Sequence, residues 1–238
     1  MFEKFKQKVK ESFSKSAMTY DCQPELHDEV IDKLLAKITG SHSRILDIGC
    51  GTGKLVGKLA KKFPAARIIG LDLAPGMVKF AQDKIKLPNA RFIEGDGEAL
   101  PFQPEQFDLI VSTASMQWMS AGKAIVEAAR VLSPQGKYYF ATFGPRTLAE
   151  LKKAGLAINY FLDQERLENL LKKVFQKTTI ETVPIVKSFN NSIEAVKYLK
   201  AIGANVYDSP LETKPARAKL ATGKIDVTFE VIYGVCEK

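Results

Sequence analysis

The fold is decided by the stretch Ile45-Leu46-Asp47-Ile48-Gly49-Cys50-Gly51-Thr52-Gly53. It reads as a buried strand that runs into a glycine loop, and residues 53–59 then take up helical spacing. Strand, tight glycine turn and helix start are how an α/β sheet lets its backbone approach a nucleotide-like ligand. A second acid, Asp72, closes the next apolar run, about twenty residues past the glycines, where a ribose diol would be bound.

The residues around the glycines discriminate between nucleotide ligands. The dinucleotide fingerprint G-x-G-x-x-G needs its third glycine at position 54, where this chain has Lys54. Asp47 would repel a pyrophosphate but suits a ligand that carries an ammonium group. S-adenosylmethionine has that ammonium, a ribose diol and an adenine, and it has no phosphate. The pattern Asp-x-Gly-x-Gly-x-Gly with an acid at the next strand end resembles motif I of class I methyltransferases, so we predict S-adenosylmethionine as the cofactor rather than a glycine turn that only packs a helix.

Further residues are expected around this ligand. Asp96, after the third predicted strand, would accept a hydrogen bond from the adenine amino group, and Gly97 would let the backbone approach the ring. Cys50 is expected to be a small filler, since sulfonium chemistry requires no enzyme thiol. The predicted cofactor-binding residues are Asp47, Gly49, Cys50, Gly51, Gly53, Asp72, Leu73, Met77, Asp96, Gly97, Glu98 and Ser112.

Length and composition agree with an α/β enzyme. The 238 residues suffice for one domain with a full core, and no apolar run approaches the ~18 residues that a membrane span needs. Residues 1–6 lack the apolar core of a signal peptide. Cys22, Cys50 and Cys236 have neither metal nor disulfide spacing, so we expect a cytoplasmic protein without a metal site or membrane contact.

The formal net charge of +8 has two interpretations. It is either a lysine-rich solvated surface or a means of attracting an acidic partner, which could be nucleic acid or a carrier protein. Because no basic run is interleaved with stacking aromatic residues, the charge gives nucleic acid little support.

The order of the predicted elements indicates one doubly wound α/β domain. Its parts are an N-terminal helical lid (1–40), the cofactor-binding core (41–144), and an acceptor lid with the last strands (145–238). Strands are predicted at 44–48, 67–71, 90–94, 106–112, 137–143, 178–186 and 227–235. Besides two N-terminal helices, helices are predicted at 53–63, 75–86, 121–132, 147–157, 163–174 and 192–204, and residues 217–224 read as a polar, glycine-broken segment.

A resemblance to a more specific family covers nearly the whole chain. The stretches that carry it are 13–21, 45–53, 70–77, 95–102, 115–118, 143–151 and 199–204. In these stretches the chain resembles the malonyl-acyl carrier protein O-methyltransferases of biotin synthesis, the BioC family. The resemblance implies a seven-stranded Rossmann-like sheet and methylation of the free carboxyl of a malonyl thioester held on acyl carrier protein. Acyl carrier proteins are strongly acidic, so the positive net charge of this chain would attract the carrier.

The reaction assigns roles to three more residues. A malonyl carboxylate is ionised at pH 7, so methyl transfer needs positioning groups and a lid rather than a general base. We expect Arg146 to orient the acceptor carboxylate, Tyr20 to close over the donor, and Trp118 to form an apolar wall.

Other residues and other functions remain open at this stage. Lys200 is either a contact for the carrier's phosphate or a solvated helix residue, and His27 and His42 are expected at the surface without a partner or a catalytic role. The protein is expected to be a monomer. The competing functions are methyl transfer to another small acceptor, such as a free carboxylic acid or a quinone, and cofactor binding by a catalytically silent subunit.

Overall fold

The computed structural model describes residues 2–22, 25–156, 158–201 and 223–238. Its helices are α1 (Phe2–Ser16), η1 (Tyr20–Cys22), α2 (Glu25–Lys37), α3 (Lys54–Lys62), α4 (Pro75–Lys84), η2 (Met116–Trp118), α5 (Ala121–Val131), α6 (Ala149–Lys153), α7 (Gln164–Leu171) and α8 (Ser192–Ala201). Its strands are β1 (Arg44–Ile48), β2 (Arg67–Asp72), β3 (Ala90–Glu94), β4 (Phe107–Thr113), β5 (Leu132–Phe143), β6 (Lys177–Phe189) and β7 (Ile225–Glu237).

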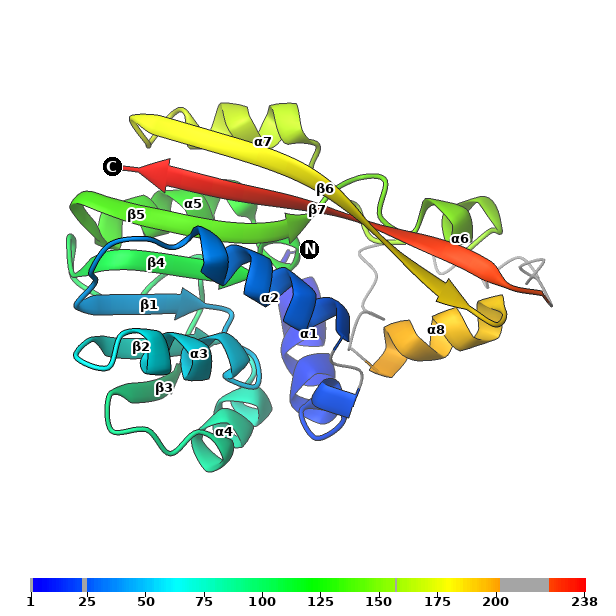
Figure 1. Ribbon diagram of the computed structural model, residues 1–238, viewed down its shortest axis with the longest axis horizontal. Helices are drawn as coiled ribbons and strands as arrows, with labels where there is room; N and C mark the ends of the chain where they lie inside the picture. The colour runs from blue at the N-terminus through cyan, green and yellow to red at the C-terminus, as the bar shows by residue number, and fades with distance from the viewer. Residues whose placement is uncertain (1, 23–24, 157, 202–222) are drawn as a thin grey trace.

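The strands form one seven-stranded sheet in the order β3-β2-β1-β4-β5-β7-β6 (Figure 1). Strands β1 to β5 are parallel, and β7 runs antiparallel to both of its neighbours. The central strands β1 and β4 are apolar on both faces because helices cover both sides of the sheet. The predicted doubly wound, seven-stranded sheet is therefore confirmed.

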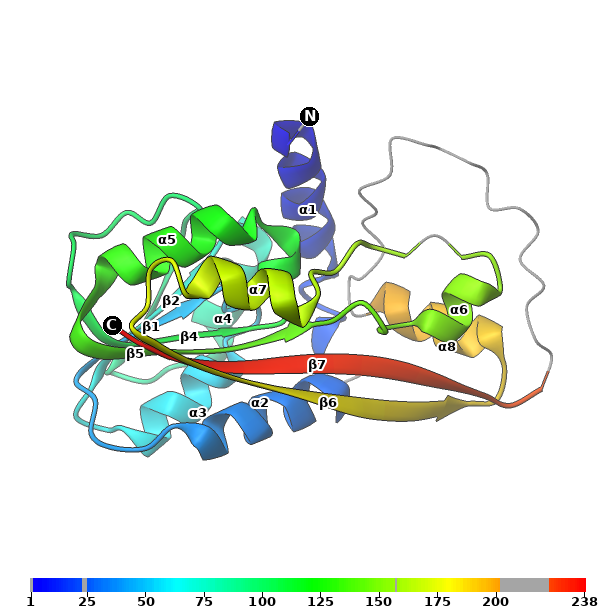
Figure 2. The same ribbon diagram turned by 90° about the horizontal axis from the view of Figure 1, so that it is seen from above.

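Helices on the two faces of this sheet build two separate hydrophobic cores (Figure 2). One core contains apolar side chains of α2, α3 and α4, among them Leu34, Leu59 and Ala81. The other contains those of α5 and α7, among them Ile125 and Leu167. The carboxyl ends of the parallel strands remain outside both layers, and ligands of such sheets bind at that edge.

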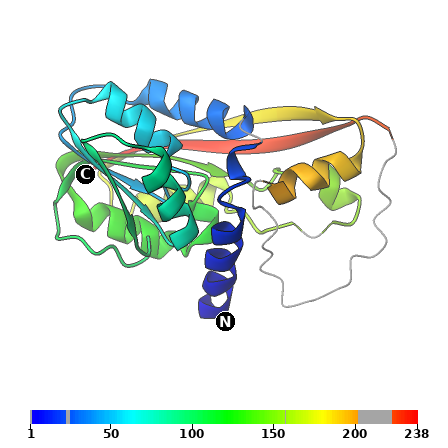
Figure 3. The same cartoon turned by 90° about the horizontal axis from the view of Figure 1, so that it is seen from below.

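The N-terminal helix α1 stands at this carboxyl edge, and its N-terminus points away from the sheet (Figures 2 and 3). It packs on the start of α4 so closely that a Cβ at Gly76 would lie 2.5 Å from the carbonyl oxygen of Ser14. Phe13, Ala17 and Met77 join in a small third apolar cluster. The amphipathic helix predicted from the sequence is present, and its apolar side faces its own domain.

The last two strands extend the sheet into a long hairpin whose far end carries α6 and α8 (Figures 1 and 2). β6 and β7 pair from Lys177–Glu237 to Phe189–Ile225, so both strands are longer than predicted. Helix α6 is shorter than the predicted 147–157, because Leu148 and Gly155 adopt left-handed backbone conformations (φ 60° and 93°) on either side of it.

Besides the helix predicted at 147–157, whose last residue lies outside the described residues, two predicted segments fall partly outside them. These are the last residues of the helix predicted at 192–204 and most of the polar segment predicted at 217–224. In the part of the chain that the structure describes, no helix is long and apolar enough to cross a membrane.

Candidate active site

The glycine loop between β1 and α3 takes the geometry that its sequence predicts. Gly49, Gly51 and Gly53 have φ values of 76°, 52° and 81°, a region that side-chain-bearing residues rarely enter. The loop is anchored by the N–H groups of Gly49 and Cys50, which donate to the carbonyl oxygen of Leu71 at 2.7 and 3.0 Å. A Cβ at Gly49 would lie 2.3 Å from that of Ser115, so this position also requires glycine on steric grounds.

A cavity opens beside this loop at the carboxyl edge of the sheet, and we call it the donor cavity. Of the predicted cofactor-binding residues, it is lined by Gly49, Gly51, Asp72, Leu73, Met77, Asp96, Gly97 and Glu98. Tyr20 and Trp118 line it as well. The segments that follow four strands, β1 to β4, and the N-terminal segment are thus brought together around one cavity.

Four predicted cofactor-binding residues lie behind that lining. Asp47 is buried at the end of β1, and Gly53 packs on Phe92, whose ring would lie 2.9 Å from an added Cβ. The Oγ of Ser112 lies 2.6 Å from the Oγ of Ser115. Cys50 is buried, and burial followed by the nearby Asp72 raises the pKa of its thiol well above the ordinary value. A protonated, enclosed thiol fits the predicted role of filler.

Asp47 is the most unusual electrostatic feature of the site. Its side chain is 1% exposed, and neither carboxylate oxygen has a hydrogen-bond partner among the described residues. Burial, and then the negative charge of Asp72, raise its pKa to about 8. A buried carboxylate without a partner is costly in free energy, and a bound cation would offset that cost. S-adenosylmethionine fits this requirement through its ammonium group.

Asp72 lies on the opposite side of the loop, at the end of β2. Its two oxygens accept hydrogen bonds from the backbone N–H groups of Gly51 and Ala74, each at 2.8 Å. Burial raises the pKa of Asp72, and these two bonds oppose the rise. Because each carboxylate oxygen can accept a second hydrogen bond, both remain able to receive a ribose hydroxyl.

The N-terminal helix α1, part of the helical lid predicted for residues 1–40, lines the donor cavity through Lys6, Val9 and Phe13. The ammonium of Lys6 lies 2.7 Å from Asp96 and 3.3 Å from Glu98, which also accepts the N–H of Ser120 at 2.9 Å. Val9 and Phe13, on the apolar side of α1, complete this wall. The amphipathic pattern of residues 2–16 does not specify which residues the helix contacts, so the contacts of Lys6 with Asp96 and Glu98 were not predicted.

Trp118 separates the donor cavity from a second space. Its ring meets that of Phe13 edge to face at 5.3 Å between centroids. On its other side is a cavity of about 210 Å³, the acceptor-side cavity, whose lining includes Thr142, Phe143 and Asn159. Trp118 lines both cavities, and so do Lys6, Glu98 and Met119.

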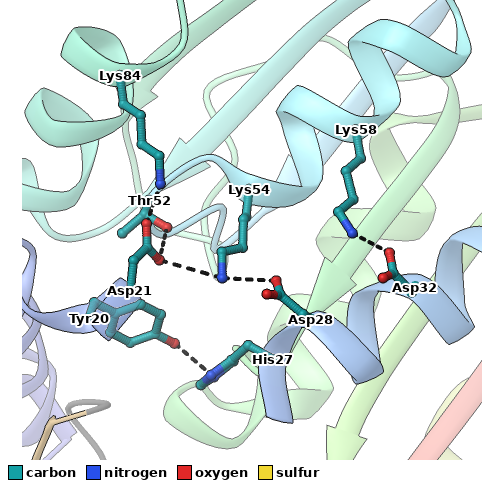
Figure 4. Close-up of polar contacts among 9 residues, drawn as sticks. All are labelled: Tyr20, Asp21, His27, Asp28, Asp32, Thr52, Lys54, Lys58 and Lys84. Carbon is teal, nitrogen blue, oxygen red and sulfur yellow. Dashed lines mark hydrogen bonds and ion pairs between the residues drawn. The ribbon is translucent and has the colours of Figure 1, made fainter. Parts of the chain in front are cut away.

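Tyr20 enters the donor cavity from η1, and polar contacts fix that short helix (Figure 4). The Oγ1 of Thr52 donates to Asp21 at 2.9 Å, and Lys84 forms an ion pair with the same carboxylate. The hydroxyl of Tyr20 lies 3.0 Å from Nε2 of His27. The glycine loop, α4 and α2 therefore all hold the segment that carries Tyr20.

The prediction that both histidines are unpartnered surface residues is wrong. His27 contacts Tyr20, while His42 contacts the carbonyl oxygen of Thr39 at 3.0 Å and lies 3.7 Å from Asp108. The polar residues near each histidine in the sequence suggested exposure. The partners Tyr20 and Asp108 are brought to the histidines only by the fold.

Arg146 follows β5 and lines neither the donor cavity nor the acceptor-side cavity. Its side chain is 73% exposed, and its Nε lies 2.6 Å from Oε1 of Glu230 on β7. The other oxygen of the buried Glu230 accepts the backbone N–H of Arg146 at 2.8 Å. Sequence reasoning missed Glu230, because it is separated from Arg146 by 84 positions.

Lys200 is exposed on α8. Within the ranges that the structure describes, no three His, Cys, Asp or Glu side chains are grouped closely enough to hold a metal ion.

Comparisons with known proteins agree with this geometry. A family model described as a methyltransferase domain matches residues 45–136. The malonyl-[acyl-carrier protein] O-methyltransferase of Methylococcus capsulatus is 36% identical over 81% of this chain and 74% of its own length. The enzyme of the same name from Geobacter sulfurreducens is 30% identical over 97% of this chain and 98% of its own length.

Solved structures share the fold. The crystal structure of the Bacillus subtilis YcgJ protein superposes with a TM-score of 0.66, covering 89% of this chain and 98% of that chain. The two sequences are 17% identical, so this likeness concerns the fold alone.

Proposed function

Since this chain belongs to the malonyl-[acyl-carrier protein] O-methyltransferase family, we propose that it transfers a methyl group from S-adenosylmethionine to the free carboxyl of malonyl-acyl carrier protein. The product would be the malonyl methyl ester, an early intermediate of biotin synthesis. The observation that carries the proposal is the pair of cavities that share Trp118 as a wall, with the unpartnered Asp47 beneath the donor side.

On the donor side, charged and apolar groups match the parts of the cofactor. Asp47 would hold the ammonium and Asp72 the ribose diol. Asp96 and Gly97 would meet the adenine edge, with Leu73 and Met77 as apolar cover. When bound, the cofactor supplies an electrophilic methyl group on a sulfonium. Gly49 and Gly51 would let the loop backbone approach the cofactor. Glu98 lines the donor cavity, and Cys50, Gly53 and Ser112 would support its lining from behind.

The acceptor side needs orientation rather than proton transfer. The acceptor carboxylate is already ionised at pH 7, and the attacking oxygen must be held about 3 Å from the methyl carbon. Glu230 holds the Nε of Arg146, and no described residue bonds its two Nη groups, which can bind one acceptor oxygen. The second oxygen would stay free to attack, with Tyr20 closing over the donor.

A dry site favours this reaction because opposite charges cancel in the transition state. Val9 and Phe13 of α1, together with Trp118, give the donor cavity apolar walls that exclude water. We expect α1 to act as part of the lid.

The partner in this proposal is acyl carrier protein, whose acidic surface matches the net charge of +8. Lys200 is a candidate contact for the carrier, since its side chain is exposed on α8. The three free cysteines fit a reducing cytoplasm, and we propose that the enzyme works there as a monomer.

The test is transfer of a labelled methyl group to malonyl-acyl carrier protein, compared with malonyl-coenzyme A and free malonate. We expect label on the carrier, released by mild base as from an ester. Arg146→Ala should abolish transfer and keep cofactor affinity, whereas Arg91→Ala, an exposed arginine on β3, should change neither. Cofactor binding without label on any acceptor would favour another small acceptor or a silent subunit. Unchanged turnover in Arg146→Ala would remove Arg146 from the site.

A further inference from the structure

We propose that His27 is a positioning residue for Tyr20, which it holds in the orientation that methyl transfer requires. This inference rests on the proposed function and adds a residue that the reaction itself does not call for. His27 belongs to α2 and Tyr20 to η1, seven positions earlier in the chain. The contact between the two side chains therefore couples the lid segment to the body of the protein.

The geometry of the pair is that of a direct hydrogen bond. The Tyr20 hydroxyl and the His27 Nε2 are 3.0 Å apart, and the ring centroids are 5.1 Å apart (Figure 4). Both side chains line a small cavity together with Gly49 and Gly51 of the glycine loop, so the pair lies directly against the loop that receives the donor. Tyr20 lines the donor cavity as well, and is the residue through which His27 reaches it.

The backbone on both sides of the pair is fixed. Asp21, next to Tyr20, is bound to Thr52 at 2.9 Å, and Asp28, next to His27, is bound to Lys54 at 2.8 Å. Both neighbours are thus held against the glycine loop and the first residue of α3, which limits the movement of Tyr20 mainly to rotation of its side chain. The hydrogen bond to His27 removes that freedom.

The neutral state of His27 also suits a site for a cationic ligand. Burial and the nearby Lys54 lower the pKa of His27 to about 4, against the opposing influence of Asp21 and Asp28. Burial and then Asp72 raise the pKa of Tyr20, so the phenol keeps its proton. A neutral imidazole can position the hydroxyl without placing a positive charge beside a sulfonium.

A double-mutant cycle tests the proposal with malonyl-acyl carrier protein as acceptor. His27→Ala should lower kcat about tenfold, the scale of one lost hydrogen bond, and leave the cofactor Kd unchanged. His27→Gln should restore most of the loss, because a side-chain amide can pair with the hydroxyl. In the Tyr20→Phe background His27→Ala should have no further effect, since the hydroxyl through which it acts is gone. His42→Ala is the matched control and should leave kcat unchanged.

A second readout needs no acceptor. In protein labelled with carbon-13 at the tyrosine Cζ, the Tyr20 resonance, assigned by its loss in Tyr20→Phe, should shift in His27→Ala and not in His42→Ala. If that shift occurs while no malonyl acceptor is methylated, the proposed function fails and the positioning role stands. An unshifted resonance, or an equal loss of kcat from His27→Ala with and without the Tyr20 hydroxyl, would overturn the inference.

Discussion

Replacing Asp47 by asparagine should stabilise the cofactor-free protein and abolish cofactor binding. Asp47 has a pKa of about 8 in the folded state and an ordinary value of 3.8. Between these values the native state keeps a proton that the unfolded state has released. The free energy of unfolding therefore falls as pH rises through this window, by up to roughly 1.4 kcal/mol per pH unit, and the contribution is fully present only below pH ~4.

Asparagine cannot ionise, so the variant escapes this loss. Its advantage over the wild type should grow by roughly 3–4 kcal/mol between pH 5 and pH 8 and then level off. Urea unfolding of the cofactor-free proteins at several pH values measures this difference. Asp83→Asn, at a side chain that is 71% exposed, is the matched control and should show no such growth. A stability difference between Asp47→Asn and the wild type that stays constant with pH would refute the reasoning.

The same titration predicts proton release on cofactor binding. At pH 6.5 a carboxyl with a pKa of about 8 is almost fully protonated, and it must ionise to pair with the ammonium group. Calorimetry in buffers of different ionisation enthalpy should therefore show release of about one proton per cofactor bound. Wild-type binding without proton release at pH 6.5 would show that Asp47 is already ionised, or that it does not meet the ammonium.

Two further substitutions test the packing of the donor cavity and the support of Arg146. Gly97→Ala should cost about 1–3 kcal/mol of stability and weaken cofactor binding, because the new Cβ would lie 2.8 Å from Sδ of Met119 and 2.9 Å from Cγ2 of Ile48. Thermal unfolding measures the loss of stability and calorimetry the loss of affinity. The control is Gly122→Ala, whose Cβ would meet nothing closer than 3.7 Å. Glu230→Gln should raise KM for the malonyl acceptor roughly tenfold and leave cofactor affinity unchanged, because one amide oxygen cannot hold both the Nε and the backbone N–H of Arg146. An unaltered KM would mean that the orientation of Arg146 does not depend on Glu230.

The sheet and its ligand edge could be predicted because their signals are local. Strand β1, the glycine loop and the start of α3 follow one another directly in the chain, and each could be recognised from its residue types. The ends of β6 were harder to predict from the sequence. Its burial alternates irregularly, and pairing with β7 extends it to Phe189. Strand length there is set by the partner strand rather than by the sequence of β6 itself.

The site divides in the same way. Asp47, Asp72 and Asp96 each follow or end a predicted strand, so the topology alone places them at one edge. The partners of Arg146 and of the cofactor-binding Asp96 were not predicted, because Glu230 is 84 positions from Arg146 and Lys6 is 90 positions from Asp96. A pair of that kind is defined by tertiary packing, and one sequence contains no signal for it. His27 was misjudged for a related reason, since its partner is a phenol whose position depends on η1.

The two sides of the site are prepared differently for their ligands. Arg146, the residue proposed to orient the acceptor, already has a carboxylate partner in Glu230 and is 73% exposed, so its ion pair contributes little to stability. On the donor side Asp47 is buried without a partner, and the cost of that burial can be recovered only when a cation arrives. The free energy of cofactor binding therefore includes the relief of an unfavourable native-state feature. If the proposed roles hold, Asp47 gains its partner only from the ligand, whereas Arg146 already has one within the chain.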